Sequence, residues 1–381
     1  MDIKKNPVFV MVLNGVTYFL SHRLPIAQEL RHQGYEVHIV SPDPKPADFE
    51  QYGFIYHQAP MSRKGVNPFT EWLAIARIFK IFKAIQPNLV HLVTIKPYLY
   101  GSIAARLARV PSVVSAVAGL GIIFSQSNFK TKLLRAVLYS LFKVAFGHKN
   151  QNVIFQNKDD KQALVDWINL AESKITVIRG AGADLNQYPY LPESDNSQPV
   201  IAFAARLLKD KGVEQFVEAS RLLKERGVAA KFWLIGEPDA GNANTVTQQQ
   251  LDEWQQAGLV ECLGYRTDIP QLFTQANIVS LPSFYGEGLP KVLIEAAACG
   301  RAVVTTDWPG CRDAITPNET GLLVPIKDSV ALADAIQTLI EDEALRHKMG
   351  KAGRKLAEDV FDVNKVVEQH MNIYKTLERT A

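Results

Sequence analysis

The sequence predicts an α/β protein with two parallel, doubly wound sheets. The chain has 381 residues, 47% apolar and 21% charged, so it is long enough for two domains that each bury a core. Short apolar runs alternate with helical patterns in two successive series along the chain. A polar, Pro-rich stretch at 188–199 separates the two series and is interpreted as a linker.

The first series defines a domain at residues 1–190. Apolar residues at helical spacing lead to Gly34, a typical helix stop, and so predict a helix between the first two strands. Phe69–Ile85 and Tyr100–Ala108 are predicted helices as well. The expected strands are Val8–Leu13, Glu36–Val40, Phe54–Tyr56, Leu89–Val93, Ser112–Ser115, Asn152–Phe155 and Ile175–Ile178.

The second series defines a domain at residues 198–361. Its expected strands are Val200–Ala204, Lys231–Ile235, Val260–Leu263, Ile278–Leu281, Ala302–Thr305 and Gly321–Val324, and its helices include Val213–Glu225, Ile269–Gln275, Leu289–Cys299 and Ser329–Glu341. A last helix, about 362–381, is expected to pack back on the first domain. Two such sheets bind a ligand in a cleft at the carboxyl ends of their strands.

Charge is distributed unevenly between the two halves. Residues 1–190 hold 22 Lys and Arg against 12 Asp and Glu, whereas residues 191–381 hold 20 against 27. No acidic residue occurs between Trp72 and Lys158. This one-sided balance points to an anionic partner for the first half, and nucleic acid, anionic lipid and a phosphorylated substrate are the candidates.

Segment 128–150 favours a membrane surface among these partners. Its leucines, phenylalanines and valines recur at helical spacing, and Lys130, Lys132, Arg135 and Lys143 lie among them. A basic amphipathic helix is typical of a segment that lies on an anionic membrane, although a core helix with solvated lysines is the alternative. Nucleic acid is not expected, because no aromatic and basic motif of a known binding module is present.

The composition also bears on the compartment. Three cysteines without a C-x-x-C pair predict neither a disulfide framework nor a structural zinc site. No secretion signal is visible, and the longest uncharged apolar stretch, 110–124, is shorter than the ~20 residues that cross a bilayer. We therefore expect a reducing compartment, and a protein that is soluble or lies on a membrane without crossing it.

The most informative motif is the stretch Gly286–Gly300, which follows a predicted strand. Pro290 suits the first turn of a helix, and the amides of Gly288 and Leu289 are expected to face an anion there. Glu287 and Glu295 are eight residues apart, so their α-carbons are separated by roughly 12 Å along a helix. This spacing suits a nucleotide sugar, which has hydroxyls at both ends and a diphosphate between them. The alternative is a capped helix with two solvated glutamates.

A second motif follows the first strand of the second domain. Arg206 and Lys211 leave the carboxyl end of this strand, where the cleft is expected. Two fixed cations there would bind a diphosphate and stabilise it as it departs. The alternative is a pair of ordinary surface charges.

Together these residues resemble the family 4 retaining glycosyltransferases, which have the GT-B fold. The Glu-x7-Glu element, the Arg206 and Lys211 pair and Asn14-Gly15 after the first strand carry the resemblance. It implies that Glu287 contacts the donor sugar, Glu295 the ribose, Arg206 and Lys211 the diphosphate, with Gly15 approaching the diphosphate and Gly236-Glu237 lying beside the nucleotide. It further implies an enzyme that needs no cofactor or metal; no D-x-D element is present.

A closer resemblance is to the bacterial subset that acts on polyprenyl-diphosphate sugars, including N-acetylgalactosaminyltransferases. Ser21-His22-Arg23-Leu24-Pro25, the segment 91–97 and Gly119-Leu120-Gly121 carry it. It implies a UDP-linked donor, a lipid-linked acceptor in surface glycan synthesis, and candidate acceptor or phosphate contacts at His22, Arg23 and Lys96. The segment 115–121, where several family members have a histidine, contains no titratable group, so a side-chain general base is not evident.

Two other functions remain open at this point. A nucleotide-sugar epimerase on the same scaffold would need acid–base residues in both domains, and the first domain offers few. A non-catalytic membrane-binding scaffold protein would use the basic helix alone and would leave Glu287 and Arg206 unexplained.

Overall fold

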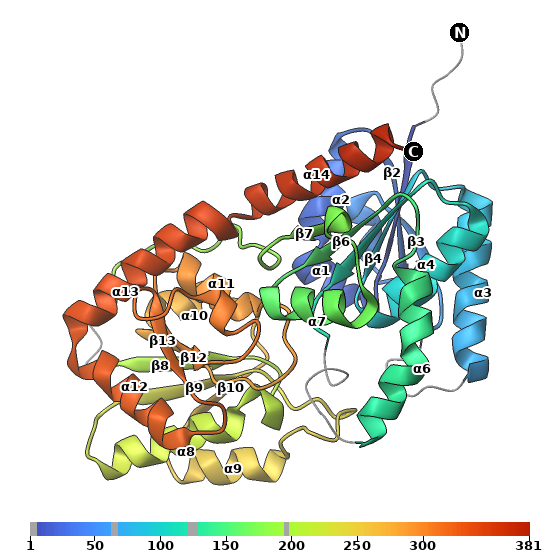
Figure 1. Ribbon diagram of the computed structural model, residues 1–381. Helices are drawn as coiled ribbons and strands as arrows, with labels where there is room; N and C mark the ends of the chain where they lie inside the picture. Colours follow the sequence, from blue (N-terminus) through green and yellow to red (C-terminus); the bar gives the residue numbers. More distant parts are fainter. Residues whose placement is uncertain (1–5, 62–67, 121–128, 194–197) are drawn as a thin grey trace. The chain divides into compact units, whose positions relative to one another are not determined.

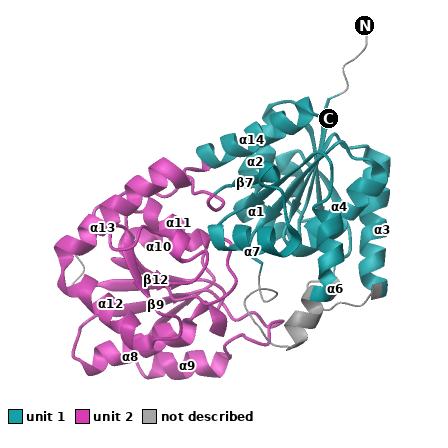
Figure 2. Cartoon of the chain, viewed as in Figure 1, with its two compact units in different colours: residues 1–178, 364–381 teal, residues 179–363 magenta. Residues whose placement is uncertain are grey.

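The computed structural model describes residues 6–61, 68–120, 129–193 and 198–381 (Figure 1). The chain forms two compact units, residues 1–178 with 364–381 and residues 179–363 (Figure 2). The division thus falls after Ile178 rather than at residue 190. The reason is that residues 182 and 183 contact residues 361–363 of the second unit. The Ala183 amide donates to Phe361 O at 2.8 Å, and a Cβ on Gly182 would meet Val363 Cα at 2.8 Å.

The first unit contains a seven-stranded parallel sheet in the order β3-β2-β1-β4-β5-β6-β7. The order reverses between β1 and β4, which makes their carboxyl ends the switch point of a doubly wound sheet. The strands are β1 Val8–Val12, β2 Glu36–Ser41, β3 Ile55–Gln58, β4 Leu89–Val93, β5 Ser112–Val117, β6 Gln151–Phe155 and β7 Ile175–Val177.

Helices cover both faces of this sheet. One buried cluster joins the sheet to α3, α4, α6 and α7, through residues such as Ile78 and Phe142. The other joins it to α1, α2 and α14, through residues such as Phe19 and Tyr374. The bounds are α1 Val16–His22, α2 Leu24–His32, α3 Pro68–Ile85, α4 Ile95–Ala108, α6 Phe129–Ala145, α7 Lys158–Ile168 and α14 Val363–Arg379, with short 3-10 turns at Phe49–Tyr52 and Glu172–Lys174.

Helix α14 lies over a buried polar cluster in the first unit. His91 Nδ1 shares a 2.6 Å hydrogen bond with the Tyr374 hydroxyl, and the His91 and His370 rings stack with centroids 5.7 Å apart. Arg23 is only 1% exposed. Burial, and then the nearby Arg23, lowers the pKa of His370 to about 3, while burial and then His370 and Arg23 lower the pKa of His91.

Because the imidazoles of His91 and His370 are buried with lowered pKa values, we expect the protein to lose stability in mild acid. Unfolding restores the ordinary histidine pKa of about 6.5, so the unfolded chain binds more protons and stability rises with pH. The contribution of His370 is fully present above pH 6.5 and falls by about 2 kcal/mol between there and pH 5. The free energy of unfolding, measured in urea at pH 7.5 and at pH 5.0, gives the size of this loss. His370→Gln should show a smaller pH effect than the unsubstituted protein, and an equal effect would contradict the prediction.

The second unit contains a six-stranded parallel sheet in the order β10-β9-β8-β11-β12-β13. Its switch point lies between β8 and β11. The strands are β8 Val200–Ala204, β9 Lys231–Ile235, β10 Glu261–Gly264, β11 Ile278–Leu281, β12 Ala302–Thr306 and β13 Gly321–Val324. The helices are α8 Val213–Glu225, α9 Gln248–Gln256, α10 Ile269–Gln275, α11 Lys291–Ala298, α12 Ser329–Glu341 and α13 Glu343–Leu356, with 3-10 turns at Lys209–Lys211 and Arg312–Ala314 and a π-helical turn at Ala357–Phe361.

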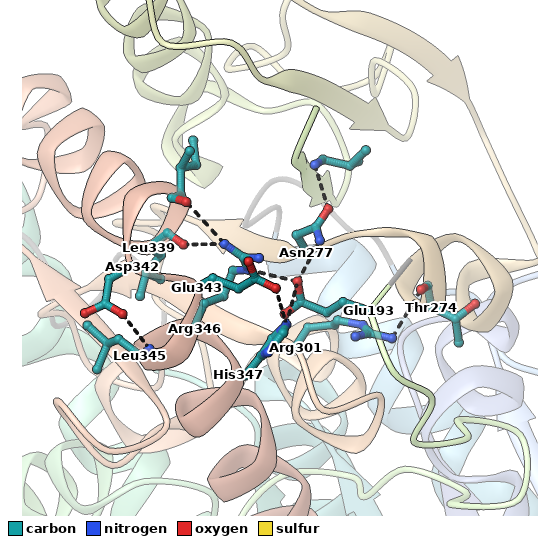
Figure 3. A network of polar contacts seen from close by, with 12 residues as sticks. Glu193, Thr274, Asn277, Arg301, Leu339, Asp342, Glu343, Leu345, Arg346 and His347 are labelled. Carbon is teal, nitrogen blue, oxygen red and sulfur yellow. Dashed lines mark hydrogen bonds and ion pairs between the residues drawn. The ribbon is translucent and has the colours of Figure 1, made fainter. Parts of the chain in front are cut away.

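The segment interpreted as a linker is fastened to this second unit (Figure 3). Glu193 accepts hydrogen bonds from Arg346 Nε at 2.9 Å and Asn277 Nδ2 at 2.6 Å, and His347 Nε2 lies 3.5 Å away. Arg301 donates to Leu191 O at 2.9 Å. The Glu193 and Arg346 side chains are 7% and 6% exposed, so this ion pair is internal. The segment therefore anchors α13 instead of acting as a free spacer.

Replacing Glu193 with alanine is expected to destabilise the second unit. The substitution leaves the buried Arg346 guanidinium without its carboxylate, a loss that typically costs about 3–5 kcal/mol. Thermal unfolding followed by circular dichroism measures the change. Glu343→Ala is the matched control, because that glutamate is 70% exposed and only approaches His347, at 3.7 Å. Equal melting temperatures for both variants would show that the buried pair does not stabilise the unit.

Candidate active site

Two of the predicted catalytic residues meet in the second unit. Lys211 Nζ forms a close ion pair with Glu287 Oε1, and both side chains are almost buried, at 13% and 12% exposed. Ser283 Oγ also donates to this carboxylate, at 3.2 Å. Lys211 follows β8 and Glu287 follows β11, so the pair lies at the switch point of the sheet, where doubly wound proteins bind their ligands.

The backbone around this pair is tightly constrained. Gly212 adopts a left-handed conformation (φ +81°), and a Cβ there would approach Pro282 O to 2.1 Å. Phe284 N donates to Asp210 O at 2.9 Å. These contacts bind the turn after β8 to the loop after β11, which fixes the separation of the ammonium and the carboxylate.

Arg206 makes a different contact from Lys211. Its side chain is 56% exposed, and its guanidinium pairs with Asp239 Oδ2 at 2.7 Å. Asp239 lies 33 residues away and has no motif of its own, so the sequence offers no reason to select it. A diphosphate bound to Arg206 would have to compete with this carboxylate or share the guanidinium with it.

The second glutamate of the motif, Glu295, is only 8% exposed. It accepts a 2.5 Å hydrogen bond from the Tyr188 hydroxyl and pairs with Lys291 Nζ at 2.9 Å. Both contacts involve Oε1, so the second oxygen has no partner among the described residues. Burial and then Glu295 raise the pKa of Tyr188, so its phenol stays protonated and donates.

The predicted nucleotide loops occupy the same unit. Gly236 has φ +138°, and a Cβ there would lie 1.9 Å from Ala205 O, so glycine is required next to the Arg206 turn. Glu237 is exposed, and its carbonyl accepts from Leu207 N at 3.0 Å.

Gly288 and Leu289 are buried just before α11. A Cβ on Gly310 would lie 2.6 Å from Gly288 O, so this loop is packed closely against the turn after β12. The helix begins at Lys291, two residues later than predicted, because Pro290 has extended backbone (ψ 121°) and acts as its N-cap. The anion-binding role of the two amides stays a prediction.

The first-unit candidates do not form one cluster in the described contacts. Gly15 is the buried N-cap of α1, and the following amide, Val16 N, donates to Asp43 Oδ2 at 2.8 Å. His22 stacks on Tyr18 at 4.3 Å and is hydrogen-bonded to Ser21 Oγ at 2.7 Å.

Arg23 and Lys96 also have different surroundings from each other. Arg23 is buried in the cluster under α14 described above. Lys96, at the start of α4, pairs with Glu71 Oε1 at 2.5 Å. Sequence analysis did not select Glu71, although it is the last acidic residue before the long basic stretch.

Helix α6 forms most of the basic segment 128–150, and the structure describes some of its side chains. Phe142 and Ala145 are buried in the core, whereas Tyr139 and Val144 are 39% and 44% exposed. Lys143 is exposed, with its Nζ 5.6 Å from the centre of the Tyr139 ring. Residue 128 and the side chains of Lys130, Lys132 and Arg135 lie outside the description, as does Gly121.

Comparison with known proteins agrees with this architecture. The model "Glycosyl transferase 4-like" matches residues 11–157, and "Glycosyl transferases group 1" matches residues 192–356. The structure of HepE from Anabaena, solved in complex with UDP-glucose, superimposes with a TM-score of 0.74 over 98% of this chain and 99% of that one, at 21% sequence identity. The two sheets therefore form the GT-B fold of glycosyltransferases.

Two named relatives indicate the family of glycosyltransferases to which the chain belongs. The N,N'-diacetylbacillosaminyl-diphospho-undecaprenol α-1,3-N-acetylgalactosaminyltransferase of Campylobacter jejuni is 31% identical, and the match covers 93% of this chain and 97% of that protein. The UDP-Gal:α-D-GlcNAc-diphosphoundecaprenol α-1,3-galactosyltransferase of Escherichia coli is 24% identical over 82% and 81%. The chain belongs to family 4 of the retaining glycosyltransferases.

Proposed function

We propose that this glycosyltransferase moves a hexose or N-acetylhexosamine from a UDP-sugar to a saccharide linked to polyprenyl diphosphate, in surface glycan synthesis. The observation that carries the proposal is the Lys211–Glu287 pair at the switch point of the second sheet. The names of the two relatives support the lipid-linked acceptor, and UDP in the name of the second supports the donor.

The charges suit departure of a nucleoside diphosphate. The bond between the anomeric carbon and the phosphate oxygen breaks, and Lys211 and Arg206 stabilise the negative charge that develops on the diphosphate. The acceptor hydroxyl bonds to the anomeric carbon on the same face and gives its proton to a diphosphate oxygen. Glu287 binds hydroxyls of the sugar, and Glu295 binds the ribose. The loops at Gly236-Glu237 and Gly288-Leu289 complete the donor site within the second unit.

An assay with purified protein tests this proposal. UDP-sugars are offered one at a time with N-acetylhexosaminyl-diphospho-undecaprenol in detergent, and NMR gives the anomeric configuration of the product. We expect transfer with retention from at least one donor. Inversion, or formation of an isomeric UDP-sugar when the acceptor is omitted, would contradict the proposal, and the second result would favour an epimerase.

We also propose that transfer needs no metal ion or other cofactor. Lys211 and Arg206 supply the positive charge that a divalent cation would otherwise bring to the diphosphate. Activity should therefore persist in EDTA. Activity that is lost in EDTA and restored by Mg²⁺ or Mn²⁺ would overturn this proposal.

We propose that the enzyme works on the cytoplasmic face of the inner membrane, held there by segment 128–150. No helix within the described ranges is long and apolar enough to cross a bilayer. The exposed Tyr139, Lys143 and Val144 on α6 and the absence of acidic residues from Trp72 to Lys158 support contact with anionic lipid. Sedimentation with vesicles should increase with their phosphatidylglycerol content. Equal sedimentation with neutral vesicles would contradict a charge-driven contact.

A further inference from the structure

Three segments of the first unit end or begin at one edge of its sheet. β1 leads into Gly15 and β4 leads into Thr94–Lys96, and these strands flank the switch point. Helix α3 ends only three residues before β4 begins and runs back across the sheet, so its first turn lies at the same edge. The 2.5 Å contact between Glu71 of α3 and Lys96 of α4 agrees with this arrangement (Figure 1).

Only one of the two oxygens of the Glu71 carboxylate accepts a hydrogen bond from the described residues. Its Oε1 accepts from Lys96 Nζ, whereas its Oε2 is buried and has no hydrogen-bond partner among the residues that the structure describes. The side chain is 12% exposed. Burial and then Glu71 raise the pKa of the neighbouring Tyr100, so the phenol stays neutral beside the carboxylate. A buried carboxylate oxygen without a donor is costly, which suggests that a ligand supplies one.

Thr94 provides an independent sign of function at the same edge. It is β-branched and yet has φ +75°, a region in which such residues are rare. Its Oγ1 is buried and, within the described ranges, makes no hydrogen bond. Strained residues that the surrounding structure holds in place occur preferentially at ligand sites.

We propose that Glu71 binds the acceptor sugar: its Oε2 accepts a hydrogen bond from a non-reacting hydroxyl of the saccharide on the lipid diphosphate, and the Thr94 hydroxyl provides a second contact. This assignment rests on the proposed function. A carboxylate repels phosphate and can only accept hydrogen bonds, so a sugar hydroxyl suits it and a diphosphate does not. Lys96 then acts by positioning Glu71 and is not a phosphate ligand.

The test compares Glu71→Gln with the wild-type enzyme, using N-acetylhexosaminyl-diphospho-undecaprenol as acceptor. Glutamine keeps the shape but loses the charge, so the acceptor KM should rise about tenfold or more while the donor KM stays within about twofold. Glu172→Gln is the matched control, because Glu172 also pairs with a lysine of the first unit, Lys161 at 2.9 Å, but is 65% exposed. An unchanged acceptor KM, or an equal rise in both KM values, would overturn the assignment.

Deoxy acceptors separate binding from a purely structural role. Each non-reacting hydroxyl of the acceptor sugar is removed in turn, and both enzymes are assayed with each derivative. For one derivative the difference between wild type and Glu71→Gln should disappear, and a difference that persists in all of them would overturn the assignment. A wild-type enzyme that glycosylates no polyprenyl-diphosphate acceptor would refute the proposed function and this assignment together, whereas an active wild type with an equally active variant refutes the assignment alone.

Discussion

Replacing Lys211 with alanine is expected to lower kcat by about 10²–10³-fold, the usual loss when one preorganised group that stabilises developing charge is removed. The ammonium is almost buried against Glu287, where charge is weakly screened, and the constrained turn at Gly212 fixes its position. Steady-state kinetics with saturating donor and acceptor measure the effect. The donor KM should change less than kcat, because the diphosphate gains its full negative charge only as the bond breaks.

Lys209→Ala is the matched control for this prediction. Lys209 lies in the same 3-10 turn, but its side chain is 47% exposed and pairs with Glu214 at 3.2 Å. Its replacement should leave kcat within about twofold, because exposed ion pairs contribute little. A Lys211→Ala variant that keeps its melting temperature and most of its kcat would show that this ammonium does not stabilise the leaving group.

Replacing Glu295 with alanine is expected to weaken donor binding by about 10–100-fold, as the loss of a charge-assisted hydrogen bond predicts. The carboxylate is held in place by Tyr188 and Lys291 through one oxygen, which leaves the other oxygen for the ribose. Calorimetry of UDP-sugar binding measures the effect directly. Unchanged donor affinity would show that the ribose assignment is wrong.

Two further variants give this second prediction its controls. Glu358→Ala removes an exposed carboxylate that also makes an i, i+4 ion pair, with Arg354 at 2.7 Å, and should not alter donor affinity. Tyr188→Phe removes only the hydroxyl that orients Glu295, so its effect on affinity should have the same sign and be smaller. A larger effect of Tyr188→Phe would indicate that the phenol, and not the carboxylate, contacts the donor.

The strands could be predicted from the sequence because both sheets are parallel and covered on both faces. Such strands are continuous apolar runs, as in Phe9–Val12 and Val200–Ala204, and each of the thirteen strands in the described part of the chain lies within two residues of its expected bounds. Lys211 and Glu287 could be selected because each lies in the segment between a recognisable strand and the helix that follows it.

Partners that are distant in the chain could not be predicted in this way. Tyr188 and Glu193 lie in a polar, Pro-rich stretch whose composition is that of a spacer, and only the folded chain brings them to Glu295 and Arg346, 107 and 153 residues away. The carboxylate at 295 lies in an otherwise apolar helix and therefore needs a partner. No local pattern indicates which residue fulfils that need.

Individual basic residues of the first half were harder to assign from the sequence than its overall positive charge. The family resemblance implied Lys96 as an acceptor or phosphate contact, and in the folded chain its ammonium pairs with a carboxylate 25 residues earlier, just outside the acid-free stretch. Arg23 was implied as an acceptor or phosphate contact by the same resemblance, and its side chain is 1% exposed. Net charge describes a region and does not identify the individual side chains that solvent or substrate can reach.

The return of the chain to the first unit at Asn364 has a practical consequence. The polypeptide passes between the units twice, so a cut between residues 178 and 179 leaves residues 364–381 of the first unit covalently attached to the second. The rest of the first unit is then held to that segment by non-covalent contacts alone. Truncation alone cannot yield an intact first half either. Its sheet and one of its covering helices, α14, come from parts of the chain that are far apart, and expressing it separately requires residues 1–178 to be joined to 364–381.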